Sequence, residues 1–279
     1  MKLNEPDSGL PRVRILHQLG RSGGTIISRC LAVMDGTLLL SEVHPYINEV
    51  LRVRCPDIKQ YLPLVQAEHW FNLTTSKDHE ELEKQGLLGD FVAEIALIHQ
   101  RCTARGERLV IRDFNNLDFA GINYHASPPF RFTTFETLQE RFGTFRFFTV
   151  RHPANQWASL TKLFTEDPTP MLQRFLLGFR LFAEHAADVG FVRYEDFTRH
   201  LERELKSICE ALELPYDPTW QARWAGYKKI TGDIRARTGK SEISPPRRNV
   251  IEPGLLHRLR SNADYRKSLE LLGYQDAHA

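Results

Sequence analysis

The chain has 279 residues, of which 42% are hydrophobic and 26% are charged, so its composition is that of a globular protein with a substantial core. The 37 basic and 35 acidic side chains leave a formal charge of +2, which argues against a general nucleic-acid binder. No apolar run approaches the roughly 20 residues of a membrane span, and residues 1–14 lack the apolar stretch of a signal peptide. We therefore expect a single cytoplasmic domain, residues 1–279, with no membrane or nucleic-acid partner.

Short apolar runs alternate with longer amphipathic stretches along the chain. The predicted strands, rich in Val, Ile, Leu or Phe, are residues 12–19, 37–41, 108–112, 145–150 and 190–194. The predicted helices are residues 24–34, 79–102, 153–164, 171–187 and 197–212. This alternation predicts an α/β three-layer sandwich in which a central parallel sheet is covered on both faces. Residues 219–250 are polar and rich in Arg and Lys, and we expect them to form an irregular segment over a site.

The four cysteines are spread singly through the chain, at Cys30, Cys55, Cys102 and Cys209. Because no two of them form a C-x-x-C pair, the sequence indicates neither a zinc site nor a disulfide framework. We expect reduced, mostly buried thiols and no bound metal.

The first predicted strand is followed directly by the loop L-G-R-S-G-G-T, residues 19–25, which opens the first predicted helix. A loop in this position offers backbone N–H groups and the positive end of a helix to an anion. The residues of this predicted phosphate-binding loop are Gly20, Arg21, Ser22, Gly23, Gly24 and Thr25. An ordinary turn between strand and helix is the alternative, and the loop lacks the lysine of the G-x-x-x-x-G-K-[ST] motif of ATP and GTP enzymes.

A second pattern, R-H-P-A-N-Q-W-A-S, follows the fourth predicted strand. It places Arg151 at the end of that strand and Ser159 eight residues later, on the next predicted helix. A cation and a hydroxyl at the carboxyl end of a strand predict a second phosphate pocket, in the crevice where open α/β sheets bind ligands.

These two motifs, in this order, resemble the PAPS-dependent sulfotransferase family, whose sulfuryl donor is 3′-phosphoadenosine-5′-phosphosulfate (PAPS). That family has a 5′-phosphosulfate loop of roughly P-[KR]-S-G-T-T, and a 3′-phosphate motif in which Pro and Ser follow an Arg by two and eight residues. R-Y-E-D-F at 193–197 is similar to the family's Y-E-D segment, which implies that Tyr194 lies against adenine. Residues 230–248 resemble the closing segment of some bacterial members, which implies nucleotide contacts from Thr231, Gly232 and Arg247.

The sequence departs from the family at two points. Gly20 stands where many members have Pro, and the K-T-H stretch that supplies a histidine base in the cytosolic small-molecule enzymes is absent. The resemblance is therefore closer to the tyrosylprotein and bacterial branch, whose base is a Glu at about the position of Glu42. It implies the P-loop-like sulfotransferase fold, PAPS as substrate, PAP as product and no metal.

Sulfuryl transfer needs a cation at the leaving oxygen, donors for the equatorial oxygens and a base for the acceptor proton. By the resemblance the cation is Arg21, which acts electrostatically because a guanidinium group stays protonated in proteins. Glu42, in S-E-V-H-P after the second predicted strand, is the expected base, and the alternative for this residue is a surface carboxylate. His44 is the rival base, and the alternative for it is a solvated loop histidine. Arg112, at the end of the third predicted strand, would assist the transition state or form a structural salt bridge.

We therefore expect a sulfotransferase that moves a sulfuryl group from PAPS to an acceptor hydroxyl or amine. The alternatives are a P-loop phosphoryl-transfer enzyme, which would need a loop lysine and carboxylates for Mg²⁺, and a catalytically silent nucleotide-binding protein. The acceptor could be a small molecule, a glycan or a peptide, and aromatic side chains in residues 45–78 and 114–134 are candidates to line its site. A second copy of the chain, in a homodimer, is a further possible partner.

Overall fold

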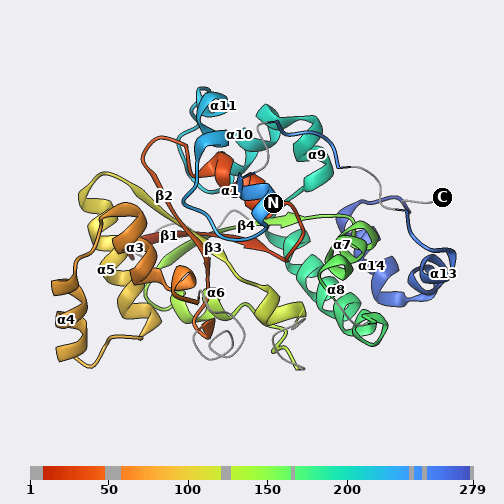
Figure 1. Cartoon of the computed structure of the whole chain (residues 1–279), viewed down its shortest axis with the longest axis horizontal. Helices are drawn as coiled ribbons and strands as arrows, with labels where there is room; N and C mark the ends of the chain where they lie inside the picture. The colour runs from red at the N-terminus through yellow and green to blue at the C-terminus, as the bar shows by residue number, and fades with distance from the viewer. Residues whose placement is uncertain are drawn as a thin grey trace.

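A single parallel sheet organises the part of the chain that the structure describes (Figure 1). The computed structural model describes residues 9–47, 58–120, 127–164, 167–238, 242–246 and 250–276. The strands are β1 Arg12–Gln18, β2 Thr37–Val43, β3 Arg108–Asp113, β4 Gly143–Val150 and β5 Phe191–Arg193. They lie in the order β2-β3-β1-β4-β5.

All neighbouring strands run parallel, so their carboxyl ends lie along one edge of the sheet. Leu16 of β1 is in register with Arg112 of β3 and with Phe147 of β4. From β1 the chain passes to β2 on one side, whereas β4 lies on the other side of β1. This change of direction places the topological switch point at the end of β1, where α/β sheets bind ligands.

Helices cover both faces of the sheet (Figure 1). On one face lie α1 Gly24–Leu31, α9 Tyr194–Arg199, α10 Leu201–Ala211, α11 Trp220–Arg223 and α12 Ile234–Thr238. On the other face, α3 Pro63–Phe71, α4 Ser76–Lys84, α5 Phe91–Ala104 and α6 Thr133–Leu138 cover β2, β3 and β1. The rest of that face is covered by α7 Pro153–Leu160, α8 Leu172–Val189, α13 Pro253–Ser261 and α14 Ala263–Leu272.

Short turns of other helix types complete the described chain. The 3-10 turns are Ile58–Tyr61, Thr161–Leu163, Thr169–Met171 and Trp224–Gly226, and Asn116–Ala120 forms a π-helical turn. No helix among the described residues is both long and apolar enough to cross a membrane.

Alternating side chains of the strands divide the core into two layers. Leu16 of β1 packs under the α1 face, whereas its neighbour Ile15 packs under the α3 and α5 face. Both residues are fully buried, which explains why the strands read as continuous apolar runs rather than as alternating ones. The predicted α/β three-layer fold with a central parallel sheet is confirmed.

Two of the predicted helices are each divided in the structure. Residues 79–102 form α4 and α5, because Gly86 and Gly89 take positive φ angles of 69° and 90° that end the first helix. Asp90 then caps α5, its side chain accepting a hydrogen bond from the Ala93 N–H. Apolar periodicity continues across this break, and the prediction of one helix over 79–102 was therefore wrong.

The predicted helix 197–212 is likewise two helices, α9 and α10. His200 separates them with φ −133° and ψ 51°, outside the helical region. Phe197 of α9 and Leu205 of α10 still pack in the same core layer, so the periodicity of one continuous helix survives the break.

The cysteines in the described part of the chain are buried thiols. Cys30, Cys102 and Cys209 are free and buried, as expected, and Cys55 lies outside the described residues. Burial raises the pKa of the Cys102 thiol to about 12 and disfavours the reactive thiolate.

The contact between α8 and the π-helical turn predicts a large effect of one added methyl group. A Cβ on Gly178 would lie 2.0 Å from the carbonyl oxygen of Phe119. Gly178→Ala should therefore lower the free energy of unfolding by about 1–3 kcal/mol, although alanine favours a helix by about 1 kcal/mol. The midpoint of urea unfolding measures this loss. Gly226→Ala, whose Cβ would have nothing within 4 Å, is the matched control; an unchanged midpoint for Gly178→Ala would contradict the packing.

Candidate active site

Side chains from three other segments hold the loop between β1 and α1. The Gly20 N–H donates to Asn116 Oδ1 at 2.6 Å, and the Gly20 carbonyl accepts from Gln156 Nε2 at 2.8 Å. The Arg21 carbonyl accepts a hydrogen bond of 3.1 Å from Arg151 Nη1. The loop backbone is thus fixed by residues that follow β3 and β4 and by α7.

The loop also packs against the aromatic residue of the Y-E-D segment. Gly23 has φ +90°, which favours glycine, and a Cβ there would lie 2.0 Å from Tyr194 Cδ2. Ser22 is buried, with its Oγ 3.4 Å from Thr149 Oγ1, and Gly24 is the first residue of α1. Glycine at position 23 therefore allows close contact between the loop and the Tyr194 ring.

The Arg21 side chain brings the two predicted phosphate motifs together. Its Nε donates to Ser159 Oγ at 3.0 Å, and its Nη1 forms an ion pair with Asp233. Arg151 lies with its guanidinium carbon 5.7 Å from the centroid of the Tyr194 ring, in a cation–π arrangement. Two cations, a hydroxyl and an aromatic ring from distant parts of the sequence therefore meet at the end of β1.

Glu42 and Arg112 form a buried ion pair beside this loop. Glu42 lies at an irregularity of β2 between Ser41 and Val43, with φ +53° and 7% of its surface exposed. Its Oε1 accepts from Arg112 Nη2 at 3.0 Å, and the same nitrogen donates to Thr25 Oγ1 at 3.0 Å. One guanidinium group therefore connects the loop hydroxyl to the carboxylate.

A directed chain of hydrogen bonds ends on the other oxygen of Glu42. Ser41 Oγ accepts from Arg112 Nη1 and from the Thr231 N–H, which fills both of its lone pairs. The Ser41 hydrogen is then donated to Thr231 Oγ1, 2.9 Å away, and the Thr231 hydroxyl donates to Glu42 Oε2 at 2.6 Å. Thr231 thus orients Glu42, and its contact with the nucleotide stays a prediction.

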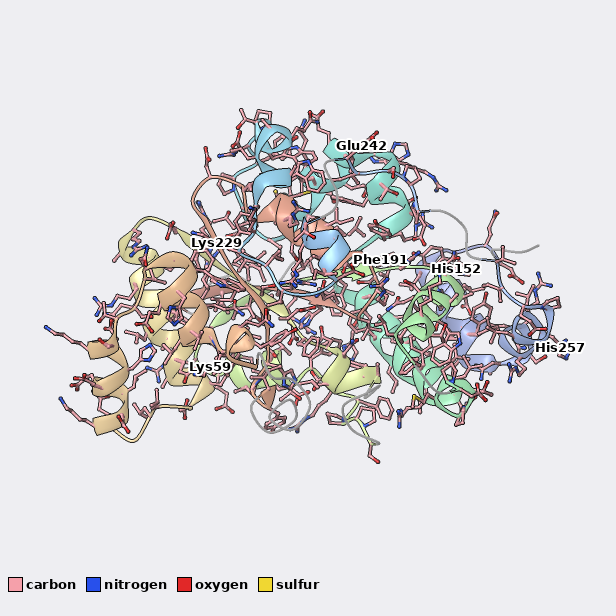
Figure 2. The ribbon with its side chains drawn as sticks, in the orientation of Figure 1. Lys59, His152, Phe191, Lys229, Glu242 and His257 are labelled. Carbon is pink, nitrogen blue, oxygen red and sulfur yellow. The ribbon has the colours of Figure 1, made fainter. Side chains whose placement is uncertain are left out.

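The segment around Thr231 lies over these groups, but residues 219–250 are not irregular throughout as predicted, because they include α11, the 3-10 turn Trp224–Gly226 and α12. A Cβ on Gly232, which has φ +99°, would lie 2.6 Å from Thr25 Oγ1 and 3.2 Å from Arg112 Nη2. Upstream, the ammonium of Lys229 is 4.9 Å from the centroid of the Phe71 ring at the end of α3, and Figure 2 shows Lys229 on the α3 side of the molecule. The segment therefore crosses the carboxyl edge of the sheet.

His44 is a buried residue rather than a solvated loop histidine. Its Nδ1 accepts a hydrogen bond of 3.1 Å from the Tyr46 N–H, so the hydrogen of the neutral ring is on Nε2. That nitrogen lies 3.2 Å from Asp118 Oδ1, which also accepts from the Thr133 hydroxyl at 2.6 Å. Both ring nitrogens of His44 are therefore engaged in hydrogen bonds.

A second buried histidine supports the loop from within the sheet. His17 Nε2 accepts from Arg146 Nε at 3.1 Å, so its Nδ1 carries the hydrogen and donates to Asp113 Oδ2 at 3.0 Å. Asn115 Oδ1 accepts the Gln18 N–H at 3.0 Å. This network ties the last residue of β1 to the residues that follow β3.

Asp113 is the acceptor at the centre of that network. Burial disfavours its charge, but hydrogen bonds from His17 and Thr134 outweigh this effect and hold the pKa of Asp113 below its ordinary value. Asn115 Nδ2 also donates to Asp113 Oδ2, at 2.7 Å. Asp113 therefore serves as a charged structural acceptor.

Sequence reasoning missed several residues that hold the site. Asn115, Asn116, Gln156 and Asp233 were not among the candidates, yet each bonds to the loop or to its neighbours. The signal for the two asparagines was the polar run D-F-N-N directly after an apolar strand, at the edge where ligands bind. For Asp233 no local signal existed beyond its neighbours in T-G-D.

Of the other candidate binding residues, Arg247 and Tyr124 lie outside the described residues. Phe119 and Phe132 are 0% and 2% exposed in the core, so they do not line an acceptor site as they stand. Phe114, at 8% exposure, stacks on Tyr61 with ring centroids 5.9 Å apart, close to the end of β3.

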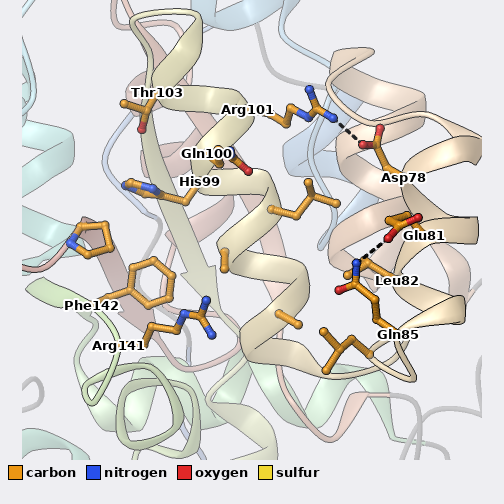
Figure 3. Close-up of a pocket in the computed structure, with 15 residues that line it drawn as sticks. Asp78, Glu81, Leu82, Gln85, His99, Gln100, Arg101, Thr103, Arg141 and Phe142 are labelled. Carbon is orange, nitrogen blue, oxygen red and sulfur yellow. Dashed lines mark hydrogen bonds and ion pairs between the residues drawn. The ribbon is translucent and has the colours of Figure 1, made fainter.

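A separate cavity of about 690 Å³ lies between α4 and α5 (Figure 3). Its lining includes Leu82, Leu97 and Phe142, and the ion pair between Asp78 and Arg101 joins the two helices beside it. None of the candidate catalytic or nucleotide-binding residues lines this cavity. Among the described residues, no three His, Cys, Asp or Glu side chains form a cluster suited to a metal ion.

Comparisons with known proteins identify the fold. No family model and no curated protein sequence matches the chain. The sulfotransferase domain of the olefin synthase of Synechococcus PCC 7002 superposes with a TM-score of 0.62, at 19% identity over 99% of each chain. The chain has the sulfotransferase fold. A sulfotransferase from Alicyclobacillus acidocaldarius superposes with a TM-score of 0.50, at 12% identity over 95% of this chain and 96% of the other.

The neutral, buried His17 should make the folded protein less stable in acid. Burial, aided by the charge of Arg146 and opposed by Asp113, lowers the pKa of His17 below its ordinary value of 6.5. The unfolded chain then takes up the proton first, so the free energy of unfolding should fall as the pH drops below 6.5. One such group gives a slope of at most about 1.4 kcal/mol per pH unit.

His17→Asn tests this assignment, because the amide nitrogen can replace the Nδ1–H donor without titrating. The variant should show a shallower decline in the free energy of unfolding between about pH 7 and pH 5, the range in which histidines titrate. Burial also lowers the pKa of His99 and of His185, but both residues are present in wild type and variant. Equal slopes for the two proteins would show that His17 does not carry the effect.

Proposed function

We propose that the protein is a PAPS-dependent sulfotransferase that transfers a sulfuryl group to an acceptor hydroxyl or amine and leaves PAP. The observation that carries this proposal is the contact of the Arg112 guanidinium with both Thr25 of the loop and Glu42. A phosphate-type loop and a carboxylate are thereby joined in one buried cluster. The sulfotransferase fold supports the same reading.

The residues around the loop suit an anionic nucleotide. Arg21 and Arg151 supply two guanidinium groups, and the buried Nε of Arg151 has no hydrogen-bond partner in the described structure. In this proposal the loop residues 20–25 hold the 5′-phosphosulfate, and Arg151 and Ser159 hold the 3′-phosphate. Tyr194, whose ring packs on the loop and is 5% exposed, is the residue that this proposal assigns to adenine.

Each charged group then has a defined part in the transfer. Glu42 accepts the proton of the acceptor hydroxyl as the acceptor oxygen bonds to sulfur. Arg21 balances the negative charge that grows on the phosphate oxygen as its bond to sulfur breaks. Arg112, between Thr25 and Glu42, supplies positive charge to the equatorial oxygens of the sulfuryl group.

The hydrogen bonds favour Glu42 over His44 as the base. Each ring nitrogen of His44 is engaged, one as an acceptor from Tyr46 and one as a donor to Asp118. A carboxylate oxygen can accept two hydrogen bonds, so Glu42 retains acceptor capacity after its bonds to Arg112 and Thr231. His44 instead anchors the chain that follows β2.

The position of Arg112 also separates this proposal from phosphoryl transfer. In P-loop NTPases the loop Ser or Thr holds Mg²⁺. Here the corresponding hydroxyl of Thr25 accepts a hydrogen bond from Arg112 Nη2 at 3.0 Å. Arg112 therefore engages the loop hydroxyl that such an enzyme uses for its metal, which favours sulfuryl transfer.

The two guanidinium groups predict selectivity for a 3′-phosphorylated nucleotide. PAP should bind without added metal and more tightly than ADP, measured by calorimetry. Because a hydrogen bond to a charged group contributes about 1.5–3 kcal/mol, Arg151→Ala should weaken PAP binding about tenfold or more and change ADP binding little. Equal losses for both nucleotides would remove Arg151 from the 3′-phosphate site.

The assignment of the base predicts a loss of turnover without a loss of nucleotide affinity. Glu42→Gln keeps an oxygen for the bond from Arg112, and it should lower the conversion of PAPS to PAP by about 10²- to 10⁴-fold. Water can serve as the acceptor in this assay, and PAP affinity should be nearly unchanged. His44→Gln should cost much less.

Glu42→Asp is the control for a folding defect. It keeps a carboxylate to pair with Arg112, but the side chain is shorter by one methylene. It should also lose turnover, with a melting temperature near that of the wild type. Near-normal turnover of Glu42→Gln together with an inactive His44→Gln would move the base to His44.

A further inference from the structure

Asp233 pairs with Arg21, the residue that the proposed reaction needs as its loop cation. Arg21 Nη1 forms an ion pair with Asp233 Oδ2, and the two side chains are 25% and 27% exposed. The other carboxylate oxygen, Oδ1, accepts the Ala236 N–H at 3.1 Å. Asp233 thus spans the loop and the first turn of α12.

A carboxylate on Arg21 opposes the proposed role of that cation. Two opposite charges in contact largely cancel each other's field at a third group. A sulfuryl donor brings its own anionic oxygens to the guanidinium, and a second anion beside them is repelled. Arg21 can therefore serve the donor fully only after Asp233 has left it.

The two residues before Asp233 lie over other groups of the proposed site. Thr231 bonds to Glu42, and Gly232 lies so close to Thr25 and Arg112 that no Cβ fits between them. Three consecutive residues therefore cover the base, the loop hydroxyl and the loop cation. In the proposed function the sulfuryl group lies between Arg21 and Glu42, beside these three residues.

We infer that Asp233 is an intramolecular counter-anion that holds Arg21 in the nucleotide-free protein and is replaced by the phosphosulfate of the donor. This inference rests on the proposed function and adds a residue that sets the affinity for the donor. The carboxylate acts as a competitor: every donor molecule must displace it before the anionic group reaches Arg21.

Asp233→Asn tests the inference, because asparagine caps a helix as well as aspartate does and lacks only the charge. The variant should bind PAP and inorganic pyrophosphate more tightly than the wild type, by about two- to fivefold, the range for an ion pair of this exposure. Adenosine, which carries no anionic group, should bind both proteins equally. Calorimetry with the full chain measures all three.

Two further variants separate charge from structure. Asp217→Asn removes the same charge from a residue that pairs with Arg223 and accepts the Thr219 N–H, so it controls for the change in net charge and should leave anion binding unchanged. Asp233→Ala loses the contact with α12 as well, and should gain anion affinity while melting at a lower temperature than Asp233→Asn.

The result that overturns the inference is unchanged or weaker binding of pyrophosphate by Asp233→Asn, which would make Asp233 a positioning residue for Arg21. An equal gain for Asp217→Asn would also overturn it, because the effect would then be one of net charge. If PAP binds no better than ADP, the proposed function fails, but the comparison with pyrophosphate still tests Asp233.

Discussion

The buried guanidinium of Arg112 is the interaction on which the candidate site depends. Arg112 is 2% exposed, and a charge so far from water must be paired and hydrogen-bonded. Its partners are Glu42, Thr25, Ser41 and the Thr231 carbonyl, which come from three separate segments. Removing one partner from a buried pair costs about 3–5 kcal/mol, so the charge also fixes the relative positions of these segments.

A second constraint acts on the loop that follows β1. Its backbone groups bond to Asn116, Gln156 and Arg151, so the loop conformation is set by its surroundings as well as by its glycines. The buried His17 and Asp113 pair extends this support into the sheet. A loop held in this way needs little rearrangement to bind a ligand, which lowers the cost of binding.

The segment from Thr231 to Asp233 joins the two halves of the site. Thr231 orients the carboxylate that we assign as the base, and Asp233 pairs with the cation that we assign to the donor. Gly232 lies between them, and a Cβ there would be 2.6 Å from Thr25 Oγ1, so the three residues pack closely on the groups below them.

The five strands, the loop after the first strand and the α/β fold could be predicted from the sequence, because apolar runs and glycines act through local geometry. It also placed Arg21, Glu42, Arg112 and Arg151 at strand ends. Their partners could not be predicted in this way: Arg21 pairs with Asp233, 212 positions away, and Glu42 accepts a hydrogen bond from Thr231, 189 positions away. Hydrogen bonds over such separations leave no periodicity or spacing in the sequence, since they depend on how distant segments pack. The division of residues 79–102 into two helices had local signals in Gly86 and Gly89, but the apolar periodicity of the core face continued across them.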